Sequence, residues 1–184
     1  EVVDEMNRLG MVIDLSHAGH KTAMDVVTYS NRPVTVTHAN PYNWHPAPRN
    51  LQHDLLQALS DTGGMVGFSL YPHHLKGGSE CGLSEFSQMA ADMVTTYGSQ
   101  MFGIGSDLCQ DQPDSVVNWM RNGHWRKTPA PPVSFPACPV WFRDNRDFPG
   151  LSDGLFAAGL PVEHVAGILG GNWMAFWDKA FAPS

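Results

Sequence analysis

The sequence lacks the features that would assign several protein classes directly. No apolar run approaches the roughly 18–20 residues that a membrane span needs. The chain of 184 residues carries a formal net charge of -7, which is not the basic footprint of a nucleic-acid-binding protein. No phosphate-binding P-loop, no GxGxxG after a strand and no GxSxG nucleophile elbow is present. These absences argue against membrane-spanning, nucleic-acid-binding, nucleotide-dependent and serine hydrolase functions.

Cysteine is also scarce, because the chain has only Cys81, Cys109 and Cys138, without any CxxC spacing. An odd number of distant cysteines favours free thiols over a disulfide framework or a zinc ribbon. The first residues, EVVDEMNRLG, contain no basic and apolar leader and already follow a helical pattern. We therefore expect one piece of a larger protein, and the sequence leaves a cytoplasmic or a periplasmic location open.

The pattern that is present is an alternation of short apolar runs and helical segments. The expected strands are residues 11–15, 34–37, 65–69 and 102–106. The expected helices are residues 1–9, 20–30, 50–64 and 82–98. Apolar strands that alternate with helices predict an α/β fold with a parallel sheet, either a doubly wound sheet or a (β/α)8 TIM barrel. Four strands make only the C-terminal half of such a barrel.

Two further segments follow the last expected strand. Residues 108–150 are rich in proline, show no clear periodicity and predict a long loop on the rim of the site. We expect this loop to be ordered by its aromatic residues, which are Trp119, Trp125, Phe135, Trp141 and Phe142. Residues 151–184 predict two or three short C-terminal helices with a break at residues 170–171.

Polar residues follow the four expected strands, at the points where the apolar runs end. They are His17, His38, Tyr71 and Asp107. The carboxyl ends of parallel strands carry the functional site, and neighbouring strands lie about 5 Å apart. Two imidazoles at such ends, His17 and His38, can therefore bind one metal ion. Asp107 can bind a metal, take a proton from a metal-bound water or hold a substrate amine, and its alternative is a loop cap.

Neighbouring residues receive weaker expectations. Asp14 is expected to support a metal-binding imidazole through the other ring nitrogen of that imidazole. Arg49 is suited to a two-point hydrogen bond with a substrate carboxylate, and a structural ion pair is its alternative. We expect His20 to be a bystander, and His73 and His74 to occupy a loop without a metal.

The motifs that carry these residues, taken in order, resemble the membrane dipeptidase family of zinc peptidases (M19). They are EMNRLGMVIDLSH, RPVTVTHAN, RNL, FGIGSDL and GGNW. The resemblance implies a metal-dependent (β/α)8 barrel of the amidohydrolase type, of which residues 1–184 would be the C-terminal portion. It also implies cleavage of dipeptides, including some with a D-residue on the C-terminal side.

The resemblance further implies a role for each matching residue. His17 and His38 would be the two histidine ligands of one of two zinc ions. Arg49 would bind the terminal carboxylate of the dipeptide, and Asp107 would contact the attacking water and the substrate amine. A hydroxide that bridges the two metals would attack the peptide carbonyl. Tyr71, at the end of the third strand, is added as a substrate contact.

The sequence also departs from the family pattern. The His-x-Asp and bridging Glu of the other zinc site, and the histidine that stabilises the oxyanion, are not found, so we expect an N-terminal half-barrel to supply them. After Asp107 the sequence reads DLCQDQP where many relatives read DFDG, which leaves the substrate open. The alternatives are an enzyme recruited to a modified-peptide or non-peptide metabolite and a metal-free scaffold protein. A homodimer is a further expectation.

Overall fold

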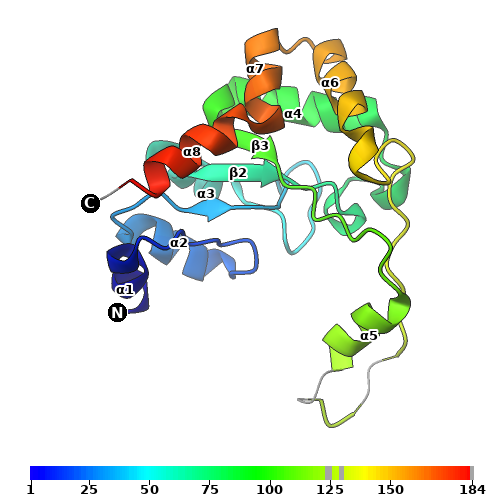
Figure 1. The fold of residues 1–184 in the computed structure, drawn as a ribbon, viewed down its shortest axis with the longest axis horizontal. Helices are drawn as coiled ribbons and strands as arrows, with labels where there is room; N and C mark the ends of the chain where they lie inside the picture. The colour runs from blue at the N-terminus through cyan, green and yellow to red at the C-terminus, as the bar shows by residue number, and fades with distance from the viewer. Residues whose placement is uncertain (123–125, 129–130, 183–184) are drawn as a thin grey trace.

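The central feature of the fold is a three-stranded parallel sheet. The computed structural model describes residues 1–122, 126–128 and 131–182, so Trp125 lies outside the described residues. The strands are β1 (Thr35–Val36), β2 (Met65–Phe68) and β3 (Phe102–Ile104), in the order β1-β2-β3. Both pairings are parallel (Figure 1). Three of the four expected strands are therefore confirmed, each in a shorter form.

The remaining expected strand, residues 11–15, forms only a single bridge with β1. Asp14 pairs with Thr35 in parallel orientation. The N–H of Leu15 donates to the carbonyl of Thr35 at 2.8 Å, and the N–H of Thr35 donates to the carbonyl of Ile13 at 3.0 Å. The next N–H along, that of Thr37, donates to the Asp14 side chain at 3.0 Å, so the backbone ladder stops after these two bonds. The segment still runs beside β1, as the sequence predicts.

Helices connect and flank the strands. The α-helices are α1 (Val2–Leu9), α2 (His20–Tyr29), α3 (His53–Asp61), α4 (Leu83–Tyr97), α5 (Asp114–Asn122), α6 (Phe148–Ala157), α7 (Val162–Ala166) and α8 (Asn172–Ala180). Short 3-10 turns cover Pro72–His74, Gly78–Glu80, Ser99–Met101 and Asn145–Asp147, and a π-helical turn covers Gly167–Gly171. The helices α1 and α2 lie beyond β1, whereas α4, α6 and α7 lie beyond β3 (Figure 1). No helix among the described residues is both long and apolar enough to cross a membrane.

The core fixes the helices on the sheet through apolar faces with helical spacing. In α3, Leu55, Leu56 and Leu59 are all buried, as their spacing predicts. The rings of Phe68 on β2 and Phe102 on β3 stack with centroids 4.7 Å apart. Burial of such large aromatic side chains contributes much of the packing energy of a core. The core therefore holds the sheet rigidly, and this fixes the positions of the strand ends.

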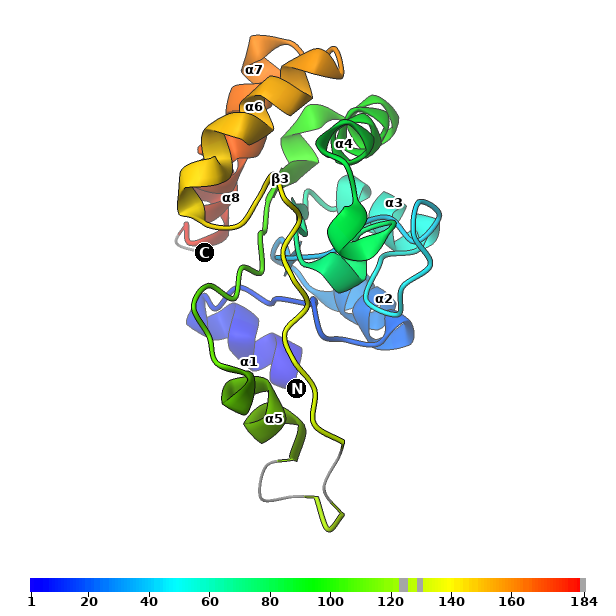
Figure 2. The ribbon, with the colours of Figure 1, turned by 90° about the vertical axis from the view of Figure 1, so that its right-hand side faces the viewer.

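The segment after β3 differs from its expected form, because it contains a helix. The helix α5 lies within residues 108–150, and α6 begins at Phe148, so the rim segment ends earlier than predicted. Side-chain bonds to the returning chain hold α5: the Asn118 amide bonds both the N–H and the carbonyl of Val133, at 2.9 and 3.0 Å. These contacts are non-local, so the local pattern did not reveal them. The segment projects from the body as an arm (Figures 1 and 2).

Aromatic residues anchor the returning end of the arm. The indole N–H of Trp141 donates to the carbonyl of Cys81 at 2.6 Å, and its ring lies 5.3 Å from that of Phe86. Phe142 is 1% exposed. Trp141 and Phe142, which were expected to order this segment, therefore do so at the base of the arm, where the chain rejoins the core.

Candidate functional site

The structure brings four of the predicted residues together at the carboxyl ends of the strands. The Nε2 atoms of His17 and His38 lie 3.3 Å apart. Nη2 of Arg49 lies 3.2 Å from Nε2 of His38, and Oδ2 of Asp107 lies 3.9 Å from the same nitrogen. Four residues that are up to 90 positions apart in the sequence thus surround one point.

The spacing of the two imidazoles fits a shared metal ion. Two nitrogen ligands bound at about 2.0–2.1 Å to a tetrahedral zinc lie about 3.3–3.4 Å from each other. The observed separation between Nε2 of His17 and Nε2 of His38 is 3.3 Å. In the part of the chain that the structure describes, no group of three or more metal-binding side chains occurs. The chain therefore offers two ligands for such an ion.

Asp14 connects the two histidine loops. Its Oδ1 accepts hydrogen bonds from the N–H and the hydroxyl of Ser16, at 3.0 and 2.6 Å. The N–H and the hydroxyl of Thr37 donate to the same carboxylate at 3.0 and 2.7 Å. Burial raises the pKa of Asp14, but the hydrogen bonds from Ser16 and Thr37 outweigh it and hold the pKa below its usual range. A carboxylate charge therefore sits between the two loops.

The hydrogen bonds of Thr37 determine which nitrogen of His38 carries the proton. The Thr37 hydroxyl donates to Asp14, so a lone pair of its oxygen faces Nδ1 of His38 at 2.9 Å. Nδ1 must then carry the proton, which leaves Nε2 as an acceptor, and Nη2 of Arg49 lies 3.2 Å from it. That is the form of an imidazole that binds a metal. Asp14 thus supports His38 through Thr37, one residue further away than the direct contact that the sequence predicts.

Burial lowers the pKa of the His17 imidazole, and the nearby charge of Arg49 lowers it further, which favours the neutral form. A neutral imidazole has a lone pair available for a metal.

Arg49 carries an unsatisfied donor beside the histidine pair. Its Nε atom is buried and has no hydrogen-bond partner among the described residues. No ion pair between Arg49 and a carboxylate is found in residues 1–122, 126–128 and 131–182, so the structural ion pair lacks a partner there. A buried donor of this kind is satisfied by an anionic oxygen that a ligand brings.

Asp107, whose Oδ2 lies 3.9 Å from Nε2 of His38, shares a cavity with Tyr71. Asp107 has a φ of 51°, a left-handed conformation that Asp adopts more readily than most residues. Both residues line a small cavity beneath the arm, together with Cys109, Cys138 and other residues of the rim segment. Burial raises the pKa of the Tyr71 phenol, and the neighbouring Cys109 and Asp107 raise it further, so the hydroxyl keeps its proton.

Glycine allows the strand ends to come this close. A Cβ atom added at Gly67 would lie 2.0 Å from the carbonyl oxygen of Thr37, and one added at Gly105 would lie 1.7 Å from it. Any other residue would push away the backbone that directly precedes His38. The glycines of GIGSDL thus allow a close approach of the backbones at the end of β3.

A buried amide network was missed by the sequence analysis. The Asn40 amide group donates to the carbonyls of Ser69 and His74, at 2.9 and 3.1 Å, and its oxygen accepts from the N–H of Ser69. The Asn50 side chain accepts from the N–H of Asn40 and donates to the His74 carbonyl. This network locks the loops after β1 and β2 together. Asn40 in THAN and Asn50 in RNL are visible in the sequence as polar residues near the strand ends, but the groups that they bond are distant in sequence.

His74 is closer to the site than expected. It was expected in a loop without a metal, and it lies in the 3-10 turn after β2 with a side chain only 5% exposed. Its ring centroid is 6.3 Å from that of His38. His20, expected to be a bystander, bonds Asp54 at 3.2 Å on the surface.

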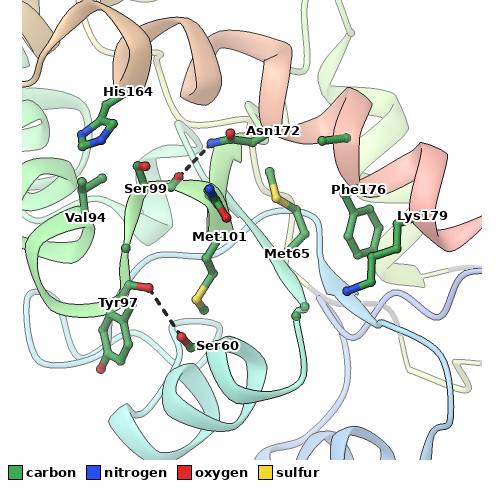
Figure 3. Close-up of a pocket in the computed structure, with 15 residues that line it drawn as sticks. Ser60, Met65, Val94, Tyr97, Ser99, Met101, His164, Asn172, Phe176 and Lys179 are labelled. Atoms are coloured by element: carbon green, nitrogen blue, oxygen red, sulfur yellow. Dashed lines mark hydrogen bonds between the residues drawn. The ribbon is translucent and has the colours of Figure 1, made fainter.

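A separate groove lies at the opposite edge of the sheet. Its volume is about 800 Å³, and it is lined by residues that precede β2 and β3 and by α8 (Figure 3). Met65 and Met101 line it, and Phe176 and Lys179 face it from α8. This amino-end groove contains no carboxylate or cysteine, and it is separate from the histidine pair.

Parallel strands alternating with helices, and polar groups that converge at their carboxyl ends, define the class of α/β enzymes whose site lies at that edge. Residues 1–120 match the model of the membrane dipeptidases, peptidase family M19. The chain belongs to this family of peptidases.

Individual relatives agree with this assignment. Dipeptidase aclJ of Aspergillus oryzae is 30% identical over 177 residues, which are 93% of this chain and 35% of that protein. An amidohydrolase from Pseudomonas aeruginosa superposes with a TM-score of 0.87 at 28% identity, over 98% of this chain and 55% of its own. A metallopeptidase from Rhodobacter sphaeroides, solved with a phosphinate mimic of the dipeptide L-Ala-D-Ala, shares the fold with a TM-score of 0.79 at 23% identity, over 97% of this chain and 45% of its own.

The chain thus spans 35% of the length of aclJ and 55% of that of the Pseudomonas structure. Its parallel α/β arrangement matches about half of the amidohydrolase structure, and the described strands form an open sheet.

Proposed function

We propose that the protein is a zinc-dependent dipeptidase in which His17 and His38 bind one of two zinc ions. The observation that carries this proposal is the 3.3 Å separation of two Nε2 atoms, one of which has its lone pair fixed by the Asp14–Thr37 hydrogen bond. The remaining ligands, and the strands that close the barrel, would come from a half-barrel beyond residues 1–184. Zinc supplies a water of lowered pKa and polarises the substrate carbonyl.

The other residues of the site then have separate roles. Arg49 binds the carboxylate of the dipeptide, which satisfies its unpartnered Nε and orients the peptide bond. Asp107, 3.9 Å from His38, takes a proton from the attacking water and contacts the substrate amine. Tyr71 keeps its proton and offers a hydroxyl donor to the substrate.

The relatives support a dipeptide as the substrate. One curated relative is named a dipeptidase, and one structure of the same fold holds a mimic of L-Ala-D-Ala. The arm that follows Asp107 favours one alternative, an enzyme recruited to a modified peptide or a non-peptide amide. Trp119 on α5 is 61% exposed, so this arm carries an exposed aromatic side chain. The hydrogen bonds that Asp14 and Thr37 make around His38 favour a metal-binding protein over a metal-free scaffold.

The test compares substrates and metal content in the purified protein. We expect hydrolysis of L,L- or L,D-dipeptides and about two zinc ions per chain by elemental analysis. His17→Ala is expected to lose at least one zinc and to lower kcat/KM by about 100-fold or more, because it removes a direct ligand. His20→Ala is the control and should keep both. A His17→Ala protein with full zinc and activity contradicts the ligand assignment, and activity only on non-peptide amides supports the recruited enzyme.

A further inference from the structure

The motif GGNW, at the start of α8, is used by none of the roles described so far. Its Asn172 and Trp173 both bond the backbone at β3, although the bonded groups are 69 to 73 positions apart in the sequence. The Asn172 amide donates to the carbonyl of Ser99 at 2.8 Å (Figure 3) and to that of Phe102 at 2.7 Å. The indole N–H of Trp173 donates to the carbonyl of Ile104 at 2.9 Å. The start of α8 therefore bonds both the beginning and the end of β3.

These bonds lie on the edge of β3 that faces away from β2. The N–H of Gly105 donates to the carbonyl of Phe68 on β2 at 3.0 Å, and successive residues of a strand direct their backbone groups to opposite edges. The carbonyls of Phe102 and Ile104 therefore point to the other edge. Within the part of the chain that the structure describes, no strand pairs with β3 there, and two side chains of α8 bond this edge instead.

The end of β3 depends on this support because of its sequence. Ile104 stands between Gly103 and Gly105, and glycine has more backbone freedom than any other residue. Asp107 follows two residues after Gly105, with a φ of 51°. The bond from Trp173 to the Ile104 carbonyl thus fixes the outer edge of the strand three residues before Asp107.

The indole of Trp173 is itself held in place. Its ring stacks on that of Trp177, with the ring centroids 5.3 Å apart. A Cβ atom added at Gly103 would lie 2.3 Å from Nε1 of Trp173, so the indole lies directly against the strand backbone. The other end of α8 is bonded by Arg32, whose Nη1 donates to the carbonyl of Ala180 at 3.1 Å. The helix is therefore a fixed support for the end of β3.

We propose that Trp173 is a positioning residue for Asp107, which acts by fixing the carbonyl of Ile104 and with it the path of the chain into Asp107. This inference rests on the proposed function, in which Asp107 contacts the substrate amine and takes a proton from the attacking water. It extends that function to α8, which lines the groove at the opposite edge of the sheet. A displacement of about 1 Å at a catalytic group can lower the rate by about 100-fold, so a fixed strand end directly affects catalysis.

The experiment compares two substrates of the full-length protein, a dipeptide with a free amine and the same compound with the amine replaced by hydrogen. The ratio of their kcat/KM values reports the contact between Asp107 and the amine. Trp173→Phe keeps an aromatic ring but removes the N–H, and we expect this ratio to fall by about tenfold, because a charge-assisted hydrogen bond is weakened. The kcat for the dipeptide should also fall, since Asp107 takes a proton in the reaction. Zinc content should be unchanged.

Asn172→Ala is the matched control, because it removes two bonds to β3 and to the turn before it, far from Asp107. It should lower the melting temperature at least as much as Trp173→Phe does, but leave the substrate ratio unchanged. Gly103→Ala displaces the indole from the strand side and should lower the ratio as Trp173→Phe does. A ratio that is unchanged in both Trp173→Phe and Gly103→Ala, or that falls equally in Asn172→Ala, overturns the inference.

Hydrogen–deuterium exchange separates this inference from the proposed function. In Trp173→Phe, the amides of residues 105–108 should exchange about tenfold faster than in the wild type, because the strand end opens more often. In Asn172→Ala these amides should exchange at nearly the wild-type rate. Equal exchange in the wild type and Trp173→Phe overturns the inference, whatever the substrate is. A wild-type protein that hydrolyses no dipeptide instead overturns the proposed function.

Discussion

At the scale of single residues, one carboxylate organises the candidate site. Asp14 accepts four hydrogen bonds from Ser16 and Thr37, and the Thr37 hydroxyl in turn fixes the proton of His38. Three of these bonds reach Oδ1 and one reaches Oδ2. Asp14 therefore acts by orienting its neighbours.

Thr37 is the residue at which this arrangement can be tested. Thr37→Val keeps the shape of the side chain but removes the acceptor for Nδ1–H of His38. We expect zinc affinity to fall by about 10- to 100-fold, the range found when such supporting partners of metal ligands are removed. Competition with a chromogenic chelator measures this affinity. Thr37→Ser retains the hydroxyl and should bind zinc nearly as well as the wild type. Equal zinc affinity of the wild type, Thr37→Val and Thr37→Ser would refute the role of Thr37.

Arg49 makes a separate prediction about the substrate. Arg49→Ala should raise KM for free-carboxylate dipeptides by about tenfold or more, because a charge-assisted hydrogen bond is lost. Arg49→Lys should recover only part of this loss, since an ammonium cannot form the two parallel bonds of a guanidinium. Steady-state kinetics on acid and amide substrates measure the effect. Unchanged KM in Arg49→Ala would exclude its carboxylate-binding role.

The buried thiol of Cys81 predicts how the stability of the fold depends on pH. Burial raises the pKa of its thiol to about 11, whereas the thiol of the unfolded chain titrates near 9. Between pH 9 and 11 the unfolded chain releases this proton first, so Cys81 should make stability fall as the pH rises through this range. Urea unfolding in this pH range, compared with Cys81→Ala, tests the sign. Iodoacetamide at pH 9 should leave Cys81 unmodified until the protein unfolds, as mass spectrometry can show.

The sequence predicted the residues of the site better than their connections. His17, His38, Arg49 and Asp107 could be named because each follows an apolar strand or lies in a recognisable motif. His74 was expected in a loop without a metal because it follows Pro72 and precedes two glycines, and nothing local shows that two distant asparagines bond its carbonyl. Buried polar networks depend on tertiary contacts, which a linear pattern does not contain.

At the scale of secondary structure, the glycines of β2 and the β3 end determine how closely the loops approach. A Cβ atom at Gly105 would lie 1.7 Å from the carbonyl oxygen of Thr37. Gly105→Ala should therefore displace the backbone before His38, lower the free energy of unfolding by about 1–3 kcal/mol and weaken zinc binding. Chemical denaturation and chelator competition measure the two effects. The control is Gly150→Ala in α6, where a Cβ meets open space and stability should be unchanged or slightly higher.

The elements themselves were predictable where their signals are local. The helices around residues 20–30, 50–64 and 82–98 have apolar faces with helical spacing and stop signals, and all three are present. The first strand and α5 were not predictable, for opposite reasons. Residues 11–15 look like a strand but have one neighbour among the described residues, whereas α5 looks irregular but is held by Asn118 and its bonds to the returning chain.

At the scale of the whole molecule, metal binding and folding should be coupled. His17 and His38 belong to different loops, so an ion held by both would crosslink them. Removal of zinc with a chelator should lower the free energy of unfolding, by about 2.7 kcal/mol relative to a hundredfold excess of free zinc over its Kd. Thermal unfolding with and without zinc measures the shift. His17→Ala should show a much smaller shift, and an equal shift in both proteins would argue against zinc at this pair.

The arm has a consequence for how this protein can change over time. Its outgoing end leaves from Asp107, and its returning end is fastened by Trp141 and Phe142 to the core. Between these two fixed points, loop-closure entropy changes only slowly with chain length. Insertions, deletions and new sequences in the arm can therefore accumulate without moving the histidines. The candidate site and the arm are thus separate parts of the fold, so the binding surface of the arm can change while the site is retained. This is how a single scaffold gives rise to enzymes with different substrates.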